Sequence, residues 1–571
     1  MTYDLVIVNG LVVDGSGMPA FAADVGIAGG RIQTVGDVDT AGAREVLDAR
    51  GHVVAPGFID PHTHYDAQLF WDPLATPTSW HGFTTVLMTN CGFGIAPVRR
   101  EHEDYVRRML SKVEAIPLAS LEQGVPWTWT SYAEYLAALD RGLGVNVLSL
   151  APHSTIRYYV MGDDARKRAA SGEEIAAMAA LAGECLEAGA VGVSSSWGPV
   201  HFDGDGVPVP SRWAAEEELL ALARVLRAAG RGVFCFIPRN VPLVSADDVA
   251  MMARLSLESG RPVLWNLLLH SWTAPDHWRR VLAWTAEEFR GGARLYPLAL
   301  PERFDLNFSL RGGIFGDMPA WKDFFETSRT RAEKMARLRT PEVRAALQTD
   351  LDDPTPRVFS KRMQDVLVNA VTHERNRAFV GRTVVELGQA QDKTPLAAML
   401  DLALDEDLAT DFLIVGFQNG DEAALRGMIE DPHVVVGGSD GGAHVQFICQ
   451  VTYSTHLLAH WVRAKGVLSL ETAVRRLTFE PAMLLGLTDR GLVREGLAAD
   501  LVVFDPDRVS AGPREERRDL PGGATRIVRR AEGYEATIVN GAVVLRDGEP
   551  TGALPGRVGR RTPRAMSRRS A

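Results

Sequence analysis

The sequence is poor in cysteine and lysine and contains no long apolar run. Four cysteines in 571 residues are too few for a disulfide framework, which favours a reducing compartment and predicts a cytoplasmic protein. No apolar stretch approaches the roughly 20 residues of a membrane-spanning helix. The first residues also lack the basic and apolar segments of a secretory signal. We therefore expect neither a membrane partner nor secretion.

An excess of positive charge is also missing. The net charge is −11 and the pI about 5.8, which argues against a nucleic-acid partner. The basic residues near the C-terminus are local, and we expect residues 554–571 to form a flexible basic tail. The hydrophobic fraction of 46% is ordinary for a globular protein with room for one large and one small domain.

The two ends of the chain resemble each other. An Asn-Gly pair lies between β-rich runs at Asn9-Gly10 and again at Asn540-Gly541. This pattern is the strongest short signal for a β-hairpin. We expect residues 1–55 and 487–553 to form one small β-sandwich domain built from both termini.

The middle of the chain, residues 56–486, alternates short β-branched runs with helical stretches such as Glu173–Ala188 and Ala214–Ala229. Eight such units predict an α/β fold, the (β/α)8 TIM barrel. A doubly wound sheet is the alternative, but no Gly-x-Gly-x-x-Gly motif opens the first helix. The expected strands are Val53–Asp60, Thr84–Asn90, Val145–Leu150, Val191–Ser194, Val233–Ile237, Pro262–Leu268, Arg294–Leu298 and Val434–Gly437.

A long insertion, at about 300–430, separates the last two expected strands. Much of it is charged and helical in pattern, as over Thr327–Leu338. Long insertions at barrel loops often carry lids or substrate contacts, and the glycine-rich stretch Gly312–Gly316 has the composition of a flexible apolar flap. An inert insertion is the alternative.

The stretch Pro56–His64 is an apolar run that ends in two histidines one residue apart. Residues i and i+2 of a strand point to the same face, so His62 and His64 suit one metal ion. Active sites of TIM barrels lie at the C-terminal ends of the strands. Cys91 follows the second strand and offers a thiolate, a strong zinc ligand. Asp440 follows the eighth and could bind metal and accept a proton from water.

Together, Pro56–His64, Thr89–Cys91 and Ser439–His444 resemble the amidohydrolase superfamily. More narrowly, they resemble the D-aminoacylase (N-acyl-D-amino-acid deacylase) family, in which a cysteine replaces the bridging carboxylated lysine of other amidohydrolases. This sequence agrees, because none of its lysines ends an expected strand. The segments Asp519–Ala524 and Thr551–Gly556 are also similar, so the resemblance covers nearly the whole chain and is weakest across the insertion.

The resemblance implies a zinc site and its chemistry. The implied ligands are His62, His64, Cys91 and Asp440, with Asp440 as general base and then general acid to the leaving amine. Metal coordination lowers the pKa of water from about 15.7 to roughly 7 and polarises the scissile carbonyl. The expected substrate contacts are His153, Arg157, Arg212 and His444. Either arginine could bind a substrate carboxylate through two hydrogen bonds, and a surface arginine is the alternative for each.

The family also places one histidine on strand five and one on strand six. Here Ile237 and Leu267 fall at those positions, and an apolar side chain cannot bind a metal. His270 lies an odd step from Leu267, which turns it to the other face of a regular strand. We therefore expect one Zn²⁺ per chain, with His201, His270 or His444 as a further ligand left open.

The leading hypothesis is a metal-dependent amidohydrolase that cleaves an amide C–N bond, most simply that of an N-acyl D-amino acid or a related amide. One alternative is a cyclic amide, imide or lactone hydrolase with the same chemistry. Another is a non-catalytic barrel that binds a small molecule. The four retained donors count against the second alternative. We expect a small-molecule substrate as the partner, and a homo-oligomer is left open.

Overall fold

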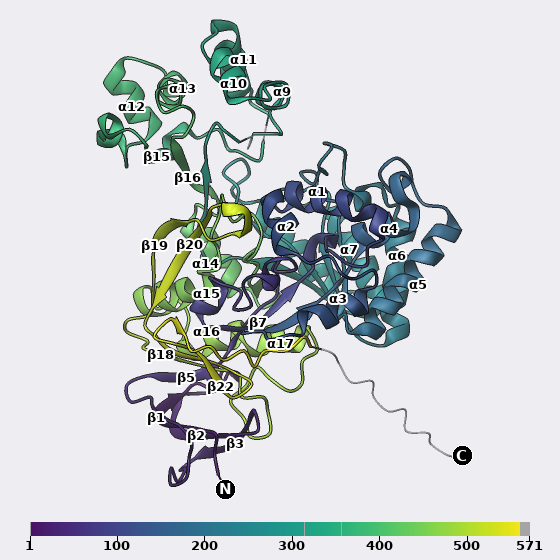
Figure 1. The fold of residues 1–571 in the computed structure, drawn as a ribbon, viewed down its shortest axis with the longest axis vertical. Coiled ribbons are helices and arrows are strands. Elements are labelled where there is room, and N and C mark those ends of the chain that lie inside the picture. The colour runs from purple at the N-terminus through teal and green to yellow at the C-terminus, as the bar shows by residue number, and fades with distance from the viewer. Residues whose placement is uncertain (1, 313–314, 356, 560–571) are drawn as a thin grey trace.

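The computed structural model describes residues 2–312, 315–355 and 357–559. A lobe formed by the insertion, a barrel-like middle part and a sheet from both chain termini follow one another along the long axis (Figure 1). Residues 313–314 of the stretch expected as a flap lie outside the described residues, as do residues 560–571 of the expected tail.

The strands of the middle part pair in parallel and follow one another in chain order. β6 (Phe58–Asp60), β7 (Phe83–Met88) and β8 (Asn146–Ser149) form one sheet. The second sheet begins two residues later and contains β9 (Ala151–Pro152), β10 (Gly192–Ser196), β11 (Val233–Ile237), β12 (Val263–Trp265), β13 (Leu295–Ala299) and β17 (Val435–Val436). A parallel bridge between Thr63 and Gly441 joins the segments that follow β6 and β17. This order is TIM-barrel-like.

The first expected strand, Val53–Asp60, is split in two. β5 (Val53–Pro56) pairs with strands of the terminal sheet, and β6 pairs with β7 of the barrel-like part. Gly57 separates them, and a Cβ atom there would lie 2.2 Å from the Thr84 side chain. Only glycine allows this close approach, so the chain crosses from one part to the other at that residue.

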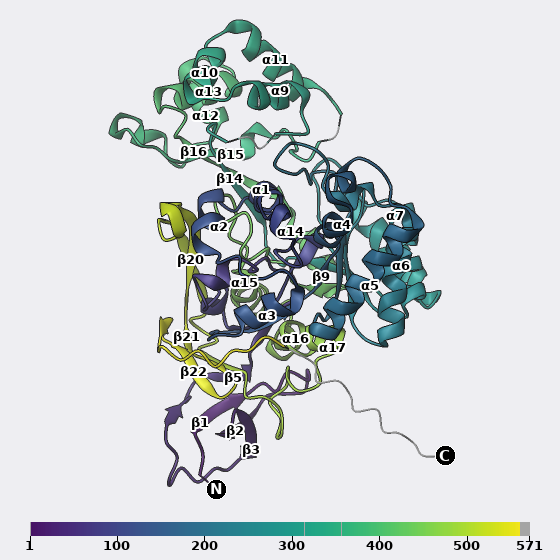
Figure 2. The same cartoon turned by 45° about the vertical axis from the view of Figure 1, so that its right-hand side comes forward.

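Helices cover the outside of the parallel strands (Figure 2). α5 (Gly172–Ala188) begins with a capping box between Ser171 and Glu174 and ends at Gly189, whose φ is 133°. Every residue of β11 is buried, as expected for a strand covered on both faces. The remaining helices of this part are α1 (Glu103–Val113), α2 (Leu118–Gly124), α3 (Tyr132–Leu139), α4 (His153–Met161), α6 (Glu216–Ala229), α7 (Ala246–Ser259), α8 (His277–Arg290), α14 (Glu422–Glu430), α15 (Tyr453–His456), α16 (Leu470–Leu477) and α17 (Phe479–Leu484).

The insertion is a folded lobe with its own core. Its antiparallel sheet consists of β14 (Phe304–Phe308), β16 (Asp411–Gln418) and β15 (Val366–Ala370), in that order. Phe308, Trp321 and Phe412 are buried within the lobe's own apolar cluster. Its helices are α9 (Pro319–Thr327), α10 (Arg331–Leu338), α11 (Pro341–Asp352), α12 (Val384–Gln391) and α13 (Pro395–Asp405). Because it buries its own core, the lobe is a separate layer beside the barrel-like part.

Both termini enter one nine-stranded sheet, the terminal sheet. Its strands are β1 (Leu5–Val12), β2 (Phe21–Ala28), β3 (Arg31–Gly36), β4 (Val46–Asp48), β5, β18 (Leu501–Phe504), β21 (Tyr534–Val539), β22 (Ala542–Arg546) and β23 (Glu549–Pro550). Two further strands, β19 (Ser510–Arg517) and β20 (Arg526–Glu532), form an antiparallel pair that reaches the barrel-like part. There the Ile527 N–H donates to the Val445 carbonyl at 2.6 Å.

The two Asn-Gly pairs have different structures. Asn540-Gly541 connects β21 to β22 as predicted, with both φ values positive. The expected turn at Asn9-Gly10 is wrong, because β1 runs straight through it with a bulge. Asn9 donates hydrogen bonds to the carboxylates of Asp24 and Asp48. A Cβ on Gly10 would lie 2.5 Å from the Val54 side chain. Packing against the neighbouring strand therefore overrides the local turn signal.

Residues 554–559 of the segment expected as a flexible tail are among the described residues. Gly556 and Gly559 donate backbone hydrogen bonds to Leu143 and Val147, and Val558 is buried. Residues 556–559 therefore pack along the start of β8 and do not belong to a flexible tail.

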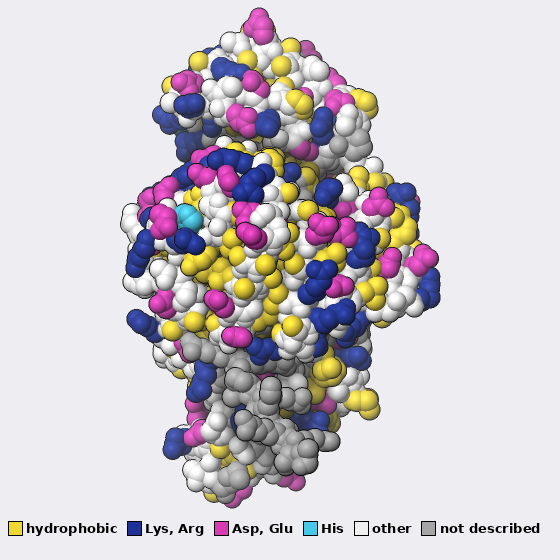
Figure 3. Space-filling view, turned by 90° about the vertical axis from the view of Figure 1, so that its right-hand side faces the viewer, with side chains coloured by type: hydrophobic (Ala, Val, Ile, Leu, Met, Phe, Trp, Pro, Cys, Tyr) yellow, Lys and Arg dark blue, Asp and Glu magenta, His cyan; other side chains and the backbone are white. Residues whose placement is uncertain are grey.

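The face around α5 and α6 concentrates apolar side chains in its middle, with charged side chains around them (Figure 3). Among the described residues, no helix combines the length and apolar character needed to cross a bilayer.

Candidate metal centre

Four side chains predicted from the sequence meet at the C-terminal end of the parallel strands. The Cys91 sulfur lies 3.4 Å from His62 Nε2 and 3.7 Å from His64 Nε2. Asp440 Oδ1 lies 3.1 Å from His62 Nε2 and 3.6 Å from His64 Nε2. Cys91 and both histidines are buried. We call these four residues the donor cluster.

Short local contacts hold the donor cluster in place. The Asp60 carboxylate, at the end of β6, accepts the His62 N–H at 3.2 Å and the Ser439 hydroxyl at 2.5 Å. The His64 N–H donates to the Gly441 carbonyl at 2.7 Å. The loop after β6 is thus bound directly to the loop that carries Asp440.

Cys91 and Asp440 both have left-handed backbone conformations, with φ of 57° and 53°. This region costs a residue with a Cβ roughly 1–2 kcal/mol. Such strain tends to persist where the surroundings impose it, as at functional sites. Here it turns both side chains toward the two histidines.

The spacing of the donor cluster fits a bound cation. Metal–ligand bonds of about 2.0–2.3 Å at tetrahedral angles place neighbouring donor atoms roughly 3.3–3.6 Å apart. The four separations given above, from 3.1 to 3.7 Å, lie close to that range. His62, His64 and Cys91 offer the nitrogen and sulfur donors that zinc prefers.

The charges of the cluster also suit a cation. Burial alone would raise the pKa of the Cys91 thiol, but His62 and His64 lower it to about 7. Burial alone would lower the pKa of His62, but Cys91 and Asp440 raise it to about 9. Against the effect of burial, the two histidines hold the pKa of Asp440 well below its usual value. A divalent cation would replace the imidazole protons and balance the same two anions.

Glu114, at the end of α1, is a member of the site that the sequence did not point to. Its carboxylate lies 3.2 Å from His64 Nδ1, and burial raises its pKa to about 8. Its backbone carbonyl accepts the His444 N–H at 2.6 Å. A carboxylate on Nδ1 fixes the ring so that Nε2 faces the donor cluster. Glu114 follows a helix rather than a strand, so no strand-end pattern marks it.

Replacing Glu114 with alanine is expected to weaken metal binding about 10- to 100-fold, because His64 loses the partner that orients its ring. Glu114→Gln keeps an oxygen that accepts the Nδ1 hydrogen bond, so its affinity should lie between those of the alanine variant and the wild type. Competition for zinc with a chromogenic chelator measures both. Glu122→Ala changes an exposed glutamate of α2 and is the control. Wild-type zinc affinity in Glu114→Ala would refute this role.

Strand five ends where the sequence predicted, and strand six ends earlier than predicted. β11 ends at the apolar Ile237. Leu267 packs toward Gly438, where an added Cβ would meet its side chain at 2.9 Å. The residue before it, Asn266, points its amide at the donor cluster, 3.4 Å from His62 Nε2. Since β12 ends at Trp265, three residues before the expected Leu268, Asn266 is the first residue after the strand.

His153 and Arg157, expected as substrate contacts, are instead parts of a buried network. Both ring nitrogens of His153 are engaged, by Ser195 Oγ and Glu218 Oε1, each at 2.7 Å. The guanidinium of Arg157 donates to Glu218 and to the carbonyls of Ala165 and Arg168. The polar atoms of both residues are thus engaged inside the α4–α6 layer, and a substrate contact by either one stays a prediction.

The other two expected contacts are His444 and Arg212. His444 is half-buried, and both Asp440 and His64 affect its pKa, which burial lowers. Arg212 donates to the His201 carbonyl at 3.2 Å, and its guanidinium lies 4.9 Å from the Phe202 ring centre. Within the described part of the chain, no carboxylate forms an ion pair with Arg212. It is therefore available to an anionic ligand.

Two further histidines were left open as ligands. His201 Nδ1 lies 2.8 Å from Ser196 Oγ, and its ring packs on Phe93. Burial, together with His444 and His64, lowers its pKa to about 3, so it is neutral. His270 packs against Trp272, and its backbone bonds to Asn419 beside the insertion lobe. Among the described residues, neither belongs to the group of donors that could share one ion.

A profile of the amidohydrolase family matches residues 45–545. This chain belongs to the amidohydrolase family. N-acyl-D-aspartate deacylase of Alcaligenes xylosoxydans xylosoxydans is 30% identical over 97% of this amidohydrolase and 94% of that protein. The similarity places the chain in the D-aminoacylase-like family, as the sequence motifs predicted.

Solved structures give the same assignment. The crystal structure of D-aminoacylase is 26% identical, covers 98% of this amidohydrolase and 100% of its own chain, and has a TM-score of 0.67. That protein has a binuclear metal centre. N-acyl-D-glutamate deacylase from Bordetella bronchiseptica, solved with zinc and a phosphonate inhibitor, is 25% identical, with coverage of 98% and 100% and a TM-score of 0.66.

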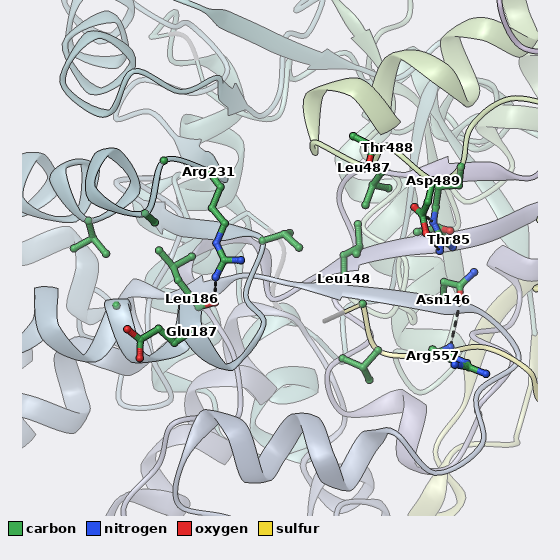
Figure 4. Close-up of a pocket in the computed structure, with 18 of the residues that line it drawn as sticks. Thr85, Asn146, Leu148, Leu186, Glu187, Arg231, Leu487, Thr488, Asp489 and Arg557 are labelled. Atoms are coloured by element: carbon green, nitrogen blue, oxygen red, sulfur yellow. Dashed lines mark hydrogen bonds and ion pairs between the residues drawn. The ribbon is translucent and has the colours of Figure 1, made fainter. Parts of the chain in front are cut away.

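One cavity of this amidohydrolase lies away from the donor cluster. Its volume is about 1460 Å³, and it opens at the N-terminal ends of the strands (Figure 4). Asn146 at the start of β8, Arg231 before β11 and Asp489 line it. Since catalytic groups of such barrels gather at the opposite, C-terminal end, we do not assign the cavity to the substrate.

Proposed function

We propose that this amidohydrolase hydrolyses the amide C–N bond of an N-acylated D-amino acid with one zinc ion per chain. The observation that carries the proposal is the convergence of His62, His64, Cys91 and Asp440 at cation-binding distances. The relatives named above act on N-acyl-D-aspartate and N-acyl-D-glutamate, which supports the substrate class. When bound, zinc would polarise the scissile carbonyl and make water more acidic.

The residues of the chain supply the proton transfers and the binding. Asp440 faces the ligand nitrogens and holds its carboxylate ionised, so it can take a proton from the attacking water. The same carboxylic acid can then pass that proton to the leaving amine. His62, His64 and Cys91 would hold the ion, with Glu114 fixing the ring of His64.

Elemental analysis and a substrate panel test the proposal together. We expect about one zinc per wild-type chain, and none in Cys91→Ala. We also expect turnover of N-acetyl-D-amino acids in preference to the L-enantiomers. Absence of metal from the wild type, or metal without turnover of any N-acyl amino acid, would refute the proposal. Two zinc ions per chain would refute the single-ion part alone.

Arg212 is proposed to bind the substrate carboxylate together with His444. Its guanidinium is half-buried without a carboxylate partner in the described chain, and a fork of two hydrogen bonds would suit a planar carboxylate. Arg212→Ala is expected to raise KM about tenfold or more, with a smaller effect on kcat, because a charge-assisted pair contributes roughly 1.5–3 kcal/mol. Arg239→Ala removes an exposed arginine stacked on Trp197 and is the control. Steady-state kinetics with equal KM values in both variants would contradict the role.

Three broader features are proposed with this function. The parallel strands would close into a complete (β/α)8 barrel at the Thr63–Gly441 bridge. Residues 1–55 and 487–553 would form a β-sandwich domain around the terminal sheet. The four free cysteines fit a cytoplasmic location.

A further inference from the structure

Asn266 is a fifth polar side chain at the donor cluster. It directly follows β12, at the same C-terminal strand end as the predicted ligands, and is only 7% exposed. Its amide nitrogen lies 3.4 Å from His62 Nε2 and 4.0 Å from Cys91 Sγ. A buried amide in this position needs a partner there.

His62 Nε2 has more polar neighbours than hydrogen bonding can satisfy. Asp440 Oδ1, Cys91 Sγ and the Asn266 amide all lie within 3.1–3.4 Å of it. One imidazole nitrogen either donates one proton or accepts through one lone pair. The spacing instead matches the separation between two donor atoms bound to the same ion, roughly 3.3–3.6 Å for zinc. A cation shared by His62, Cys91 and Asn266 would satisfy these three groups and leave the Asp440 carboxylate beside it.

The amide can present oxygen to that cation without any change of backbone. Nitrogen and oxygen of an asparagine exchange places by a half-turn of the terminal group, and their assignment depends on the partners. A lone pair on His62 Nε2 that points at an ion offers nothing to an amide N–H. The carbonyl oxygen, in contrast, is a neutral donor that adds no charge to a site whose Cys91 and Asp440 anions already balance a divalent ion.

We propose that Asn266 is a ligand of the same ion through its side-chain oxygen. The inference rests on the proposed zinc site and refines it. His62, His64, Cys91 and Asn266 would then hold the ion without a bond from Asp440, and a fifth coordination position would remain for water or substrate. The Asp440 carboxylate is then released for proton transfer, which a tightly bound ligand could perform only poorly.

Cobalt titration of the metal-free protein tests this ligand, because the visible spectrum of Co²⁺ reports its donors. We expect the Co²⁺ affinity of Asn266→Ala to fall on the order of 100-fold or more, beyond the effect typical of residues that only support a ligand, and its visible bands to change. Asn266→Asp keeps an oxygen and adds charge, so it should bind at least as tightly as the wild type. Asn240→Ala is the control, since Asn240 follows the neighbouring strand and its amide binds Asp248.

The outcomes separate this inference from the proposed function. Wild-type affinity and spectrum in both Asn266 variants would overturn the ligand role, while loss of Co²⁺ in Cys91→Ala would still support the site. If Asn266→Ala does not fold, as judged by circular dichroism and melting, an unchanged spectrum in Asn266→Asp overturns the inference. Failure of the wild type to bind Co²⁺ at all would overturn both proposals.

Discussion

Asp440→Asn is expected to lower kcat by about 10²–10⁴-fold, the usual range for loss of a general acid–base group. The amide cannot accept a proton from water or return one to the leaving amine. The fold should persist, because asparagine tolerates the left-handed conformation that Asp440 adopts at φ 53°. Zinc content should stay near that of the wild type if Asn266 supplies the fourth donor.

A matched control is available in the insertion lobe. Asp392 has the same φ of 53°, is exposed and caps α12. Asp392→Asn therefore repeats the chemical change in the same backbone conformation, far from the donor cluster, and should leave kcat unchanged. Single-turnover and steady-state assays on both variants decide the matter. Near wild-type kcat in Asp440→Asn would exclude it as the general base.

His62→Ala is expected to remove the metal and, with it, all measurable turnover. His62 Nε2 lies beside Cys91, Asp440 and Asn266, so its loss affects these three neighbours as well. Loss of a direct ligand should exceed the 10- to 100-fold effect typical of residues that only support a ligand. We expect the zinc affinity to fall on the order of 100-fold or more. After dialysis against a weak chelator, the variant should then retain less than about a tenth of a zinc ion per chain.

The control for this substitution is His52→Ala, a histidine just before β5 in the terminal sheet, where its ring contacts the Arg50 carbonyl. It should keep both zinc and turnover. If His62→Ala retained a full zinc ion, the ion would be bound elsewhere and the single-site proposal would fail. Added zinc should not restore His62→Ala at concentrations that saturate the wild type.

The sequence predicted the strand ends well, because buried parallel strands have a strong signature. β11 occupies the residues expected for it, and His62, Cys91 and Asp440 follow three strands whose ends meet in space. What local pattern could not reveal was long-range packing. Asn9-Gly10 has the same turn signal as Asn540-Gly541, but only contacts with β2 and Val54 decide that it forms a bulge.

The missed site residues have a similar cause. Glu114 lies at the end of a helix, and its role in the site depends on a contact with His64, which is 50 residues away in the sequence. Asn266 precedes Leu267, the position at which the family's histidine was expected, and no local pattern marks it as the side chain that faces the site. Successive residues of a strand face opposite sides, so a shift of one residue changes which side chain faces the site. The polar neighbour of a lost ligand is therefore worth examining in related sequences.

The β19–β20 pair has a consequence for how this enzyme can be divided. Arg526 donates to the Thr76 carbonyl beside the first barrel loop, and Arg514 binds Asn307 of the insertion lobe. Ile527 binds Val445, five residues beyond Asp440. A chain cut at residue 486 would lose all three attachments and leave the loop of the general base unsupported. The catalytic part and its terminal strands therefore form a single folding unit. Chimeras between relatives should fold only when the N- and C-terminal segments are exchanged together.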